Sequence, residues 1–158
     1  MEGMTLTSRY HKASESLLTR LFAIKSLENR RERLRIYQLP DTVVVVRYSA
    51  AALVPQWALS SPFFNITRTA DELSIVCSLR SVPEDVQGQG PWSVFQLEGP
   101  IPFTQTGVLA SVLDPLAERR IGIFAISTFD TDYVLVTAKD STDAVAVLQD
   151  AGHEIIER

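Results

Sequence analysis

Cysteine is nearly absent from this chain, and long apolar runs are missing. The single cysteine, Cys77, cannot form a disulfide within the chain, which favours a reducing compartment such as the cytoplasm. No apolar run approaches the roughly 20 residues that a transmembrane helix needs, so we expect no membrane partner. The two histidines, His11 and His153, have no cysteine or second histidine nearby in the sequence. We therefore expect surface histidines and no zinc site.

An excess of basic charge is also missing. The 158 residues include 15 Lys and Arg against 19 Asp and Glu, a formal net charge of −4. Surfaces that bind nucleic acid are basic, so this balance predicts no nucleic-acid partner. The sequence has no glycine-rich phosphate loop and no nucleophile elbow, and Asp130 with Asp132 supplies too few ligands for calcium. We predict a protein that is not an enzyme and that needs neither cofactor nor metal.

Residues 1–33 are predicted to form a helical extension. Leu17, Leu21, Ile24 and Leu27 recur at helical spacing and mark one apolar face. A helix packed on the domain, or a mobile extension, is the simpler interpretation. The alternative is a mitochondrial transit peptide, because the segment is amphipathic and rich in arginine, although its glutamates count against this.

Residues 34–82 read as a first unit of strands with one short helix. The run from Val43 to Val46 is β-branched throughout, which suits a sheet. Residues 81–91 combine prolines, glycines and polar residues, and we interpret them as an exposed connector and domain boundary. The predicted strands cover 34–39, 42–48, 63–67 and 73–79, and the predicted helix covers 50–59.

Residues 91–158 show a full βαββαβ pattern. One helix begins at Val108 and contains Pro115, where we expect a kink; the other is capped by Ser141 and ends at Gly152. This order places two helices on one face of an antiparallel sheet. The predicted fold class is α+β: two ferredoxin-like units side by side, the first incomplete, plus the N-terminal helix. The predicted strands cover 92–97, 121–127, 133–137 and 153–157.

The two units form an internal repeat. At an offset of 60 positions they align without gaps, so that Phe64 matches Phe124 and Glu72 matches Asp132 (60 = 124 − 64). Pairing two such units hides a sheet edge and creates a seam between them. The loop 98–107 is longer than its counterpart in the first unit, and this asymmetry is where we expect a binding site.

The segment 122–136, GIFAISTFDTDYVLV, resembles the hallmark segment of aspartate-kinase-type ACT domains, and more narrowly that of the CASTOR-like ACT proteins. The stretches GVLA at 107–110, DPLA at 114–117 and FNITRTADELSIV at 64–76 fit the same pattern. The resemblance covers about residues 34–157. It implies tandem ACT folds, a small ligand, usually an amino acid, bound at the seam, and a regulatory role without catalysis.

A free amino acid needs donors for its α-carboxylate. Gly107, Val108 and Leu109 lie where a helix begins, so their N–H groups and the helix dipole favour an anion. A glycine at this point also permits a close approach and unusual backbone angles. The simpler alternative is that Gly107 only shapes the entry to the helix.

The α-ammonium needs acceptors. We expect Asp132 to accept its hydrogen bonds, with the backbone carbonyls of Thr128 and Phe129 sharing this role. Glu72, the repeat equivalent of Asp132, is expected to offer a second acidic group across the seam. The alternatives are a turn-capping aspartate at 132 and a solvated carboxylate at 72.

Two other classes of function stay open at this point. One is a protein-interaction module without a small ligand, in which a sheet edge or the N-terminal helix recruits a partner or a second copy. The other is an enzyme, against which the chain's length and the missing phosphate loop both argue. Free sheet edges make a homodimer plausible.

Overall fold

The computed structural model describes residues 33–158, which form one unit of eight strands, two α-helices and three short 3₁₀ helices. Residues 1–32, which hold nearly all of the predicted N-terminal extension, lie outside the described residues. The elements are β1 (Arg35–Gln38), β2 (Val43–Tyr48), η1 (Gln56–Ser60), β3 (Phe64–Arg68), β4 (Leu73–Ser78), η2 (Leu79–Ser81), β5 (Gln89–Leu97), α2 (Val108–Glu118), β6 (Ile123–Ser127), β7 (Asp132–Thr137), η3 (Ala138–Asp140), α3 (Ser141–Asp150) and β8 (Glu154–Glu157).

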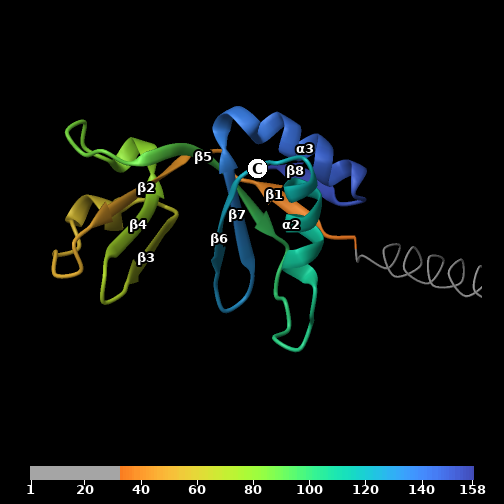
Figure 1. Cartoon of the computed structure of the whole chain (residues 1–158), viewed down its shortest axis with the longest axis horizontal. Helices are drawn as coiled ribbons and strands as arrows, with labels where there is room; N and C mark the ends of the chain where they lie inside the picture. Colours follow the sequence, from red (N-terminus) through yellow and green to blue (C-terminus); the bar gives the residue numbers. More distant parts are fainter. Residues whose placement is uncertain (1–32) are drawn as a thin grey trace, which may run out of the picture. The chain divides into compact units, whose positions relative to one another are not determined.

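Strand β5 is shared by the two repeat units (Figure 1). Near its start, Gln89 and Trp92 pair with Val45 and Val43 of β2. Farther along, β5 pairs antiparallel with β7 on one side and with β1 on the other. The nine-residue strand is therefore the fourth strand of the first unit, after β2, β3 and β4. It is also the first strand of the second unit's βαββαβ order.

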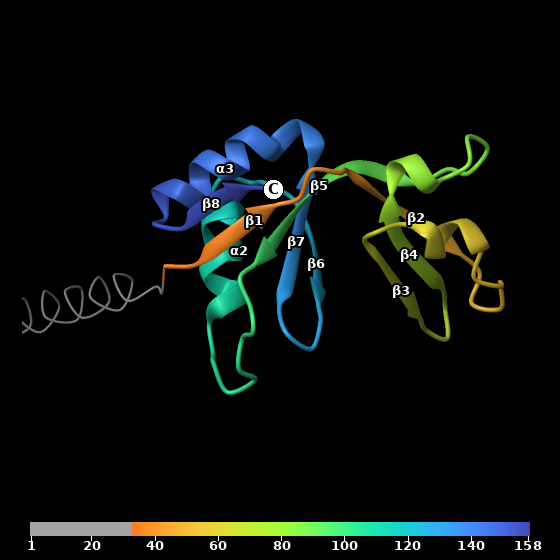
Figure 2. The ribbon, with the colours of Figure 1, turned by 180° about the vertical axis from the view of Figure 1, so that it is seen from behind.

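The strand predicted over 34–39 lies in the sheet of the second unit (Figure 2). It is β1, which runs parallel to β8 and antiparallel to β5. Its central apolar residue, Ile36, is fully buried in the core beneath the helices, together with Phe95 and Leu97. Packing of this side chain, rather than closeness in sequence to β2, explains where the strand pairs.

The two α-helices cover one face of the second unit's sheet. Val112 and Leu116 of α2 and Leu148 of α3 pack against β1, β5 and β7 in one apolar cluster. The α+β fold class with ferredoxin-like units is confirmed. In the first unit, by contrast, the helix predicted over 50–59 shortens to η1, because Pro55 fixes an extended backbone just before it.

The two units touch through the opposite face of the sheet. Val43 and Val76 of the first unit share a buried cluster with Val94 and Leu135 of the second unit. The rings of Phe63 and Tyr133 meet across the same boundary at 5.0 Å between centroids. The two units are therefore in contact through buried apolar side chains.

The hairpins β3–β4 and β6–β7 are equivalent at an offset of 59, not 60. Thr69 N–H donates to the carbonyl of Glu72, just as Thr128 N–H donates to the carbonyl of Thr131 (59 = 128 − 69). In strand β4, Ile75 faces the helical side, as Val134 of β7 does. A slip of one residue moves a strand's side chains to the other face, so the gapless alignment is wrong for these hairpins.

His153, expected at the surface, is only 4% exposed, and that expectation is wrong. Pro115 lies inside α2 and has no N–H to donate to the carbonyl of Ser111. Nε2 of His153 lies 3.1 Å from that carbonyl oxygen, and Nδ1 accepts from the N–H of Leu34 at 3.3 Å. The ring therefore satisfies a backbone acceptor that the proline leaves open.

Candidate ligand-binding site

The long loop 98–107 is hydrogen-bonded to the turn between β6 and β7. Ile101 N–H donates to the carbonyl of Asp130 at 2.8 Å, and the Thr131 hydroxyl donates to the carbonyl of Leu97 at 2.7 Å. A Cβ added at Gly99 would lie 2.7 Å from the Asp130 carbonyl oxygen. Only glycine permits so close an approach, and polar cavities open beside this junction.

The first cavity, of about 210 Å³, contains three of the predicted residues, Thr128, Phe129 and Asp132. The carboxylate of Asp132 accepts a hydrogen bond from Ser127 Oγ at 2.5 Å. The rings of Phe129 and Phe103 meet edge to face at 5.4 Å, and each residue is 80% exposed. The other lining residues are Ile101, Pro102, Gln105, Ser127 and Thr131.

The predicted anion-binding residues follow, in the sequence, the loop residues that line this cavity. Gly107 has a left-handed backbone (φ +81°) and precedes the first residue of α2 without a side-chain cap. Val108 is buried in the helical core and Leu109 packs against it, so only their backbone N–H groups are available to a ligand. None of the three lines the cavity; Gln105, two residues before Gly107, does.

Glu72 lies apart from these residues, in the hairpin of the first unit. Its carboxylate pairs with Arg47 at 2.7 Å. Its structural equivalent in the second unit is Thr131, because the hairpins align at an offset of 59. Within residues 33–158, Glu72 lines neither this first cavity nor the cavities of about 300 Å³ and 400 Å³ in the same sheet.

The cavity at the seam between the units is a different place. It has a volume of about 300 Å³ and a mostly apolar lining. None of the residues predicted to bind the ligand belongs to it. The lining residues are Leu39, Pro40, Asp41, Val43, Pro62, Phe63, Ser78, Val94, Gln96 and Tyr133.

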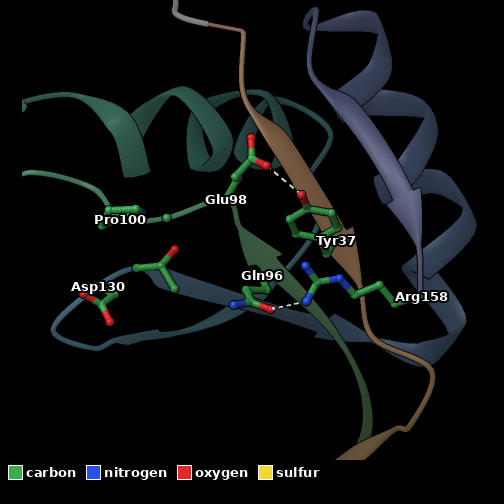
Figure 3. Close-up of a pocket in the computed structure, with 8 residues that line it drawn as sticks. Tyr37, Gln96, Glu98, Pro100, Asp130 and Arg158 are labelled. Carbon is green, nitrogen blue, oxygen red and sulfur yellow. Dashed lines mark hydrogen bonds between the residues drawn. The ribbon is translucent and has the colours of Figure 1, made fainter.

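A third cavity, of about 400 Å³, lies on the other side of the junction (Figure 3). Its polar lining includes Tyr37, Gln96, Glu98 and Arg158, which sequence reasoning did not select. These residues come from β1, β5 and the segment after β8, and only the sheet pairing brings them together. The one signal in the sequence was the charged residue Glu98 at the start of the long loop.

Other chemistries find little support in the described part of the chain. Burial raises the pKa of the Cys77 thiol, which therefore stays protonated and unreactive at neutral pH. Within residues 33–158, no three His, Cys, Asp or Glu side chains cluster as a metal site would require. No helix there is both long and apolar enough to cross a membrane.

The fold and the arrangement of the helices define a ferredoxin-like α+β domain, and comparison with known proteins supplies the family to which part of it belongs. A family model for the ACT domain matches residues 87–150, and a model for the N-terminal domain of another family matches residues 41–85. The crystal structure of protein Atu0741 from Agobacterium tumefaciens is 41% identical, with a TM-score of 0.75, and the match covers 80% of this chain and 95% of that one. The chain therefore contains an ACT domain, over residues 87–150.

Two further matches concern part of the chain or its fold alone. The human protein CASTOR3P is 32% identical over 72 residues, 46% of this chain and 41% of that protein, so the match spans less than half of the relative's length. The regulatory subunit of aspartate kinase from Thermus flavus shares the fold alone, at 9% identity and a TM-score of 0.50 over 76% of this chain and 97% of that one. The chain and that regulatory subunit therefore share a fold.

Proposed function

We propose that this protein is a regulatory sensor that binds a free amino acid beside the loop 98–107. The observation that carries the proposal is the first cavity, where this loop meets Thr128, Phe129 and Asp132. The family resemblance supports an amino acid as the ligand. The site belongs to the second unit, which packs against the first unit through apolar side chains.

The chemistry of this cavity suits a zwitterion. The Asp132 carboxylate is half-buried and already oriented by Ser127, so it can accept from an α-ammonium group without being reorganised. The N–H groups at the start of α2 lie outside the cavity lining, two residues and more beyond Gln105, and favour the α-carboxylate of a ligand that reaches past this residue. The exposed rings of Phe103 and Phe129 offer apolar surface to the ligand's side chain.

Thermal unfolding of the full chain in the presence of each standard amino acid tests the proposal. A ligand at one hundred times its dissociation constant stabilises the native state by about 2.7 kcal/mol. We expect one amino acid, or a few related ones, to raise the melting temperature. A flat response to the whole set at millimolar concentration would contradict the proposal.

The variant Asp132→Asn and its matched control Glu72→Gln locate the effect. Each replaces a carboxylate by an amide of the same shape near the start of a hairpin's second strand. We expect Asp132→Asn to abolish the response and Glu72→Gln to retain it, since the exposed Glu72–Arg47 pair contributes little. Equal responses of the two variants would remove Asp132 from the site.

A protein-interaction role is the second candidate, and the exposed aromatic pair favours it. Phe103 and Phe129 present two adjacent large rings to solvent at the cavity rim, and such surface is typical of contact sites. This role predicts an oligomer whose mass in sedimentation falls on substitution Phe103→Ser, together with no response to any amino acid.

A further inference from the structure

We infer that the third cavity, shown in Figure 3, is a second ligand site, for a small dipolar molecule that has an anionic group at one end and a cationic group at the other. The cavity lies on the face of the sheet opposite the helices, because Tyr37 and Gln96 alternate with the core residues Ile36 and Phe95. Its volume of about 400 Å³ is within the range of small-molecule sites.

The anionic end of the ligand is assigned to Arg158. Its guanidinium lies over the ring of Tyr37, 3.7 Å from the centroid, and its Nη1 donates to Gln96 Oε1 at 3.4 Å. Its backbone N–H donates to the carbonyl of Gln38 at 3.1 Å. A guanidinium has five N–H donors in a planar fork, so this anchored group retains donors for a carboxylate.

The partners of Arg158 are themselves held in place. The Tyr37 hydroxyl donates to Glu98 Oε1 at 2.7 Å, and Arg35 Nη1 donates to the same oxygen at 2.8 Å. A chain of contacts thus runs from Arg35 through Glu98 and Tyr37 to Arg158. Such preorganisation lowers the entropy that binding costs.

The cationic end is assigned to Asp130. In Figure 3, Gln96 lies between Asp130 on one side and Arg158 on the other. The backbone of Asp130 is fixed by its hydrogen bond to Ile101. The lining contains one guanidinium (Arg158) and two carboxylates (Glu98, Asp130), and Glu98 is already paired with Arg35, which lies outside the lining. One group of each sign is therefore left for a ligand, which favours a dipolar molecule over an ion of one sign.

This second site is independent of the proposed amino-acid site. The two cavities have only Thr131 in common, and the junction of loop 98–107 with the turn separates them. Opposite walls that hold the two charges suit a molecule whose charged groups are separated by several bonds. An α-amino acid without a charged side chain has its charges adjacent and fits this arrangement poorly.

The experiment is an NMR titration of the full chain with ω-aminohexanoate, using hexanoate and hexylamine as single-charge controls. We expect saturable shifts of the Gln96 side-chain amide and of the Gly99 and Thr131 backbone amides. Each control should bind about tenfold more weakly, because it lacks one charge-assisted interaction. Equal binding of either control, or the absence of saturable shifts at these residues, would overturn the inference.

Two variants and two matched controls complete the test. Arg158→Gln and Asp130→Asn remove the proposed charges from exposed positions, and we expect each to weaken ω-aminohexanoate about tenfold. Asp71→Asn alters the equivalent aspartate of the first unit's turn, and Arg80→Gln alters an exposed arginine of η2; both should bind like the unaltered chain. If all four variants bind alike, the site is not there.

The outcome is separable from that of the proposed function. The probe has no α-ammonium group, and its binding is measured at Gln96 and Thr131. The amino-acid response is measured through Asp132. Either ligand can therefore bind when the other does not.

Discussion

At the scale of single residues, Gly99 is where one added methyl group would disturb the candidate sites most directly. In Gly99→Ala the new Cβ would lie 2.7 Å from the Asp130 carbonyl oxygen and 3.1 Å from Thr131 Cβ. Neither neighbour can move without shifting the turn. We expect the free energy of unfolding in urea to fall by about 1–3 kcal/mol, with weaker binding in both cavities.

The matched control is Gly122→Ala. A Cβ at Gly122 meets nothing within 4 Å, and the backbone there is not left-handed. Alanine should leave the stability unchanged or raise it by about 0.4–1 kcal/mol, because it restricts the unfolded chain. If the two variants have the same urea midpoint, the close contact at Gly99 does not hold the junction together.

Residues near one another in the sequence were predictable as parts of one site, and residues on distant strands were not. Thr128, Phe129 and Asp132 belong to a single motif, and they line one cavity. Tyr37 and Arg158 come together only because β1 pairs with β8. Glu72 was selected through a repeat alignment that is one residue out of register. Because successive side chains of a strand point to opposite faces of the sheet, a shift of one residue matches each side chain with one on the other face.

At the scale of elements, helix α2 depends on a side chain from outside it. Pro115 leaves the Ser111 carbonyl without its helical donor, and His153 supplies the replacement. His153→Ala should lower the free energy of unfolding by at least about 1–3 kcal/mol, since the carbonyl and the Leu34 N–H both lose their partner. In a Pro115→Ala background the restored N–H should reduce that loss by about 1 kcal/mol.

A double-mutant cycle in urea measures this coupling. Its control combines His153→Ala with Glu118→Ala, a substitution at the exposed end of α2 that leaves the Ser111 carbonyl unaffected. The control pair should be additive. Additivity of the Pro115 and His153 changes would mean that the histidine does not compensate for the proline.

The sequence showed that Pro115 falls within a helix but did not show how the helix accommodates it. The compensating residue lies 38 positions away (38 = 153 − 115), and nothing in its neighbourhood marks His153 as buried. Element types and approximate positions follow from local periodicity. The hydrogen-bond partner of a backbone carbonyl that lacks its helical donor is determined by tertiary packing. Local periodicity carries no information about that partner.

At the scale of the whole molecule, the repeat and the ferredoxin-like pattern predicted two units, and the structure joins them more closely than a connector would. Residues 81–91 were expected to separate the units, yet β5 begins at Gln89 within that segment. A strand's pattern determines its two faces but not its neighbours in the sheet. Neither the sharing of β5 nor the placement of β1 was therefore predictable.

Because β5 joins both units in a single eight-stranded sheet, the units should unfold together. Ile75 is fully buried in the core of the first unit, and Ile75→Ala should lower the free energy of unfolding by about 2–5 kcal/mol. Hydrogen exchange followed by mass spectrometry across a urea series should then show β4 and β7 losing protection at the same lowered midpoint. Separate midpoints would mean that the units are thermodynamically independent.

The reverse substitution makes the test symmetric. Val134 is buried beneath the helices of the second unit, and Val134→Ala should shift the midpoint of β4 as much as that of β7. If the second unit's variant destabilised only β6 and β7, β5 would be a covalent link without energetic coupling. A shared midpoint in both variants instead means that the ligand proposed to bind beside loop 98–107 would stabilise the first unit as well, which is how the proposed sensor would transmit the presence of its ligand.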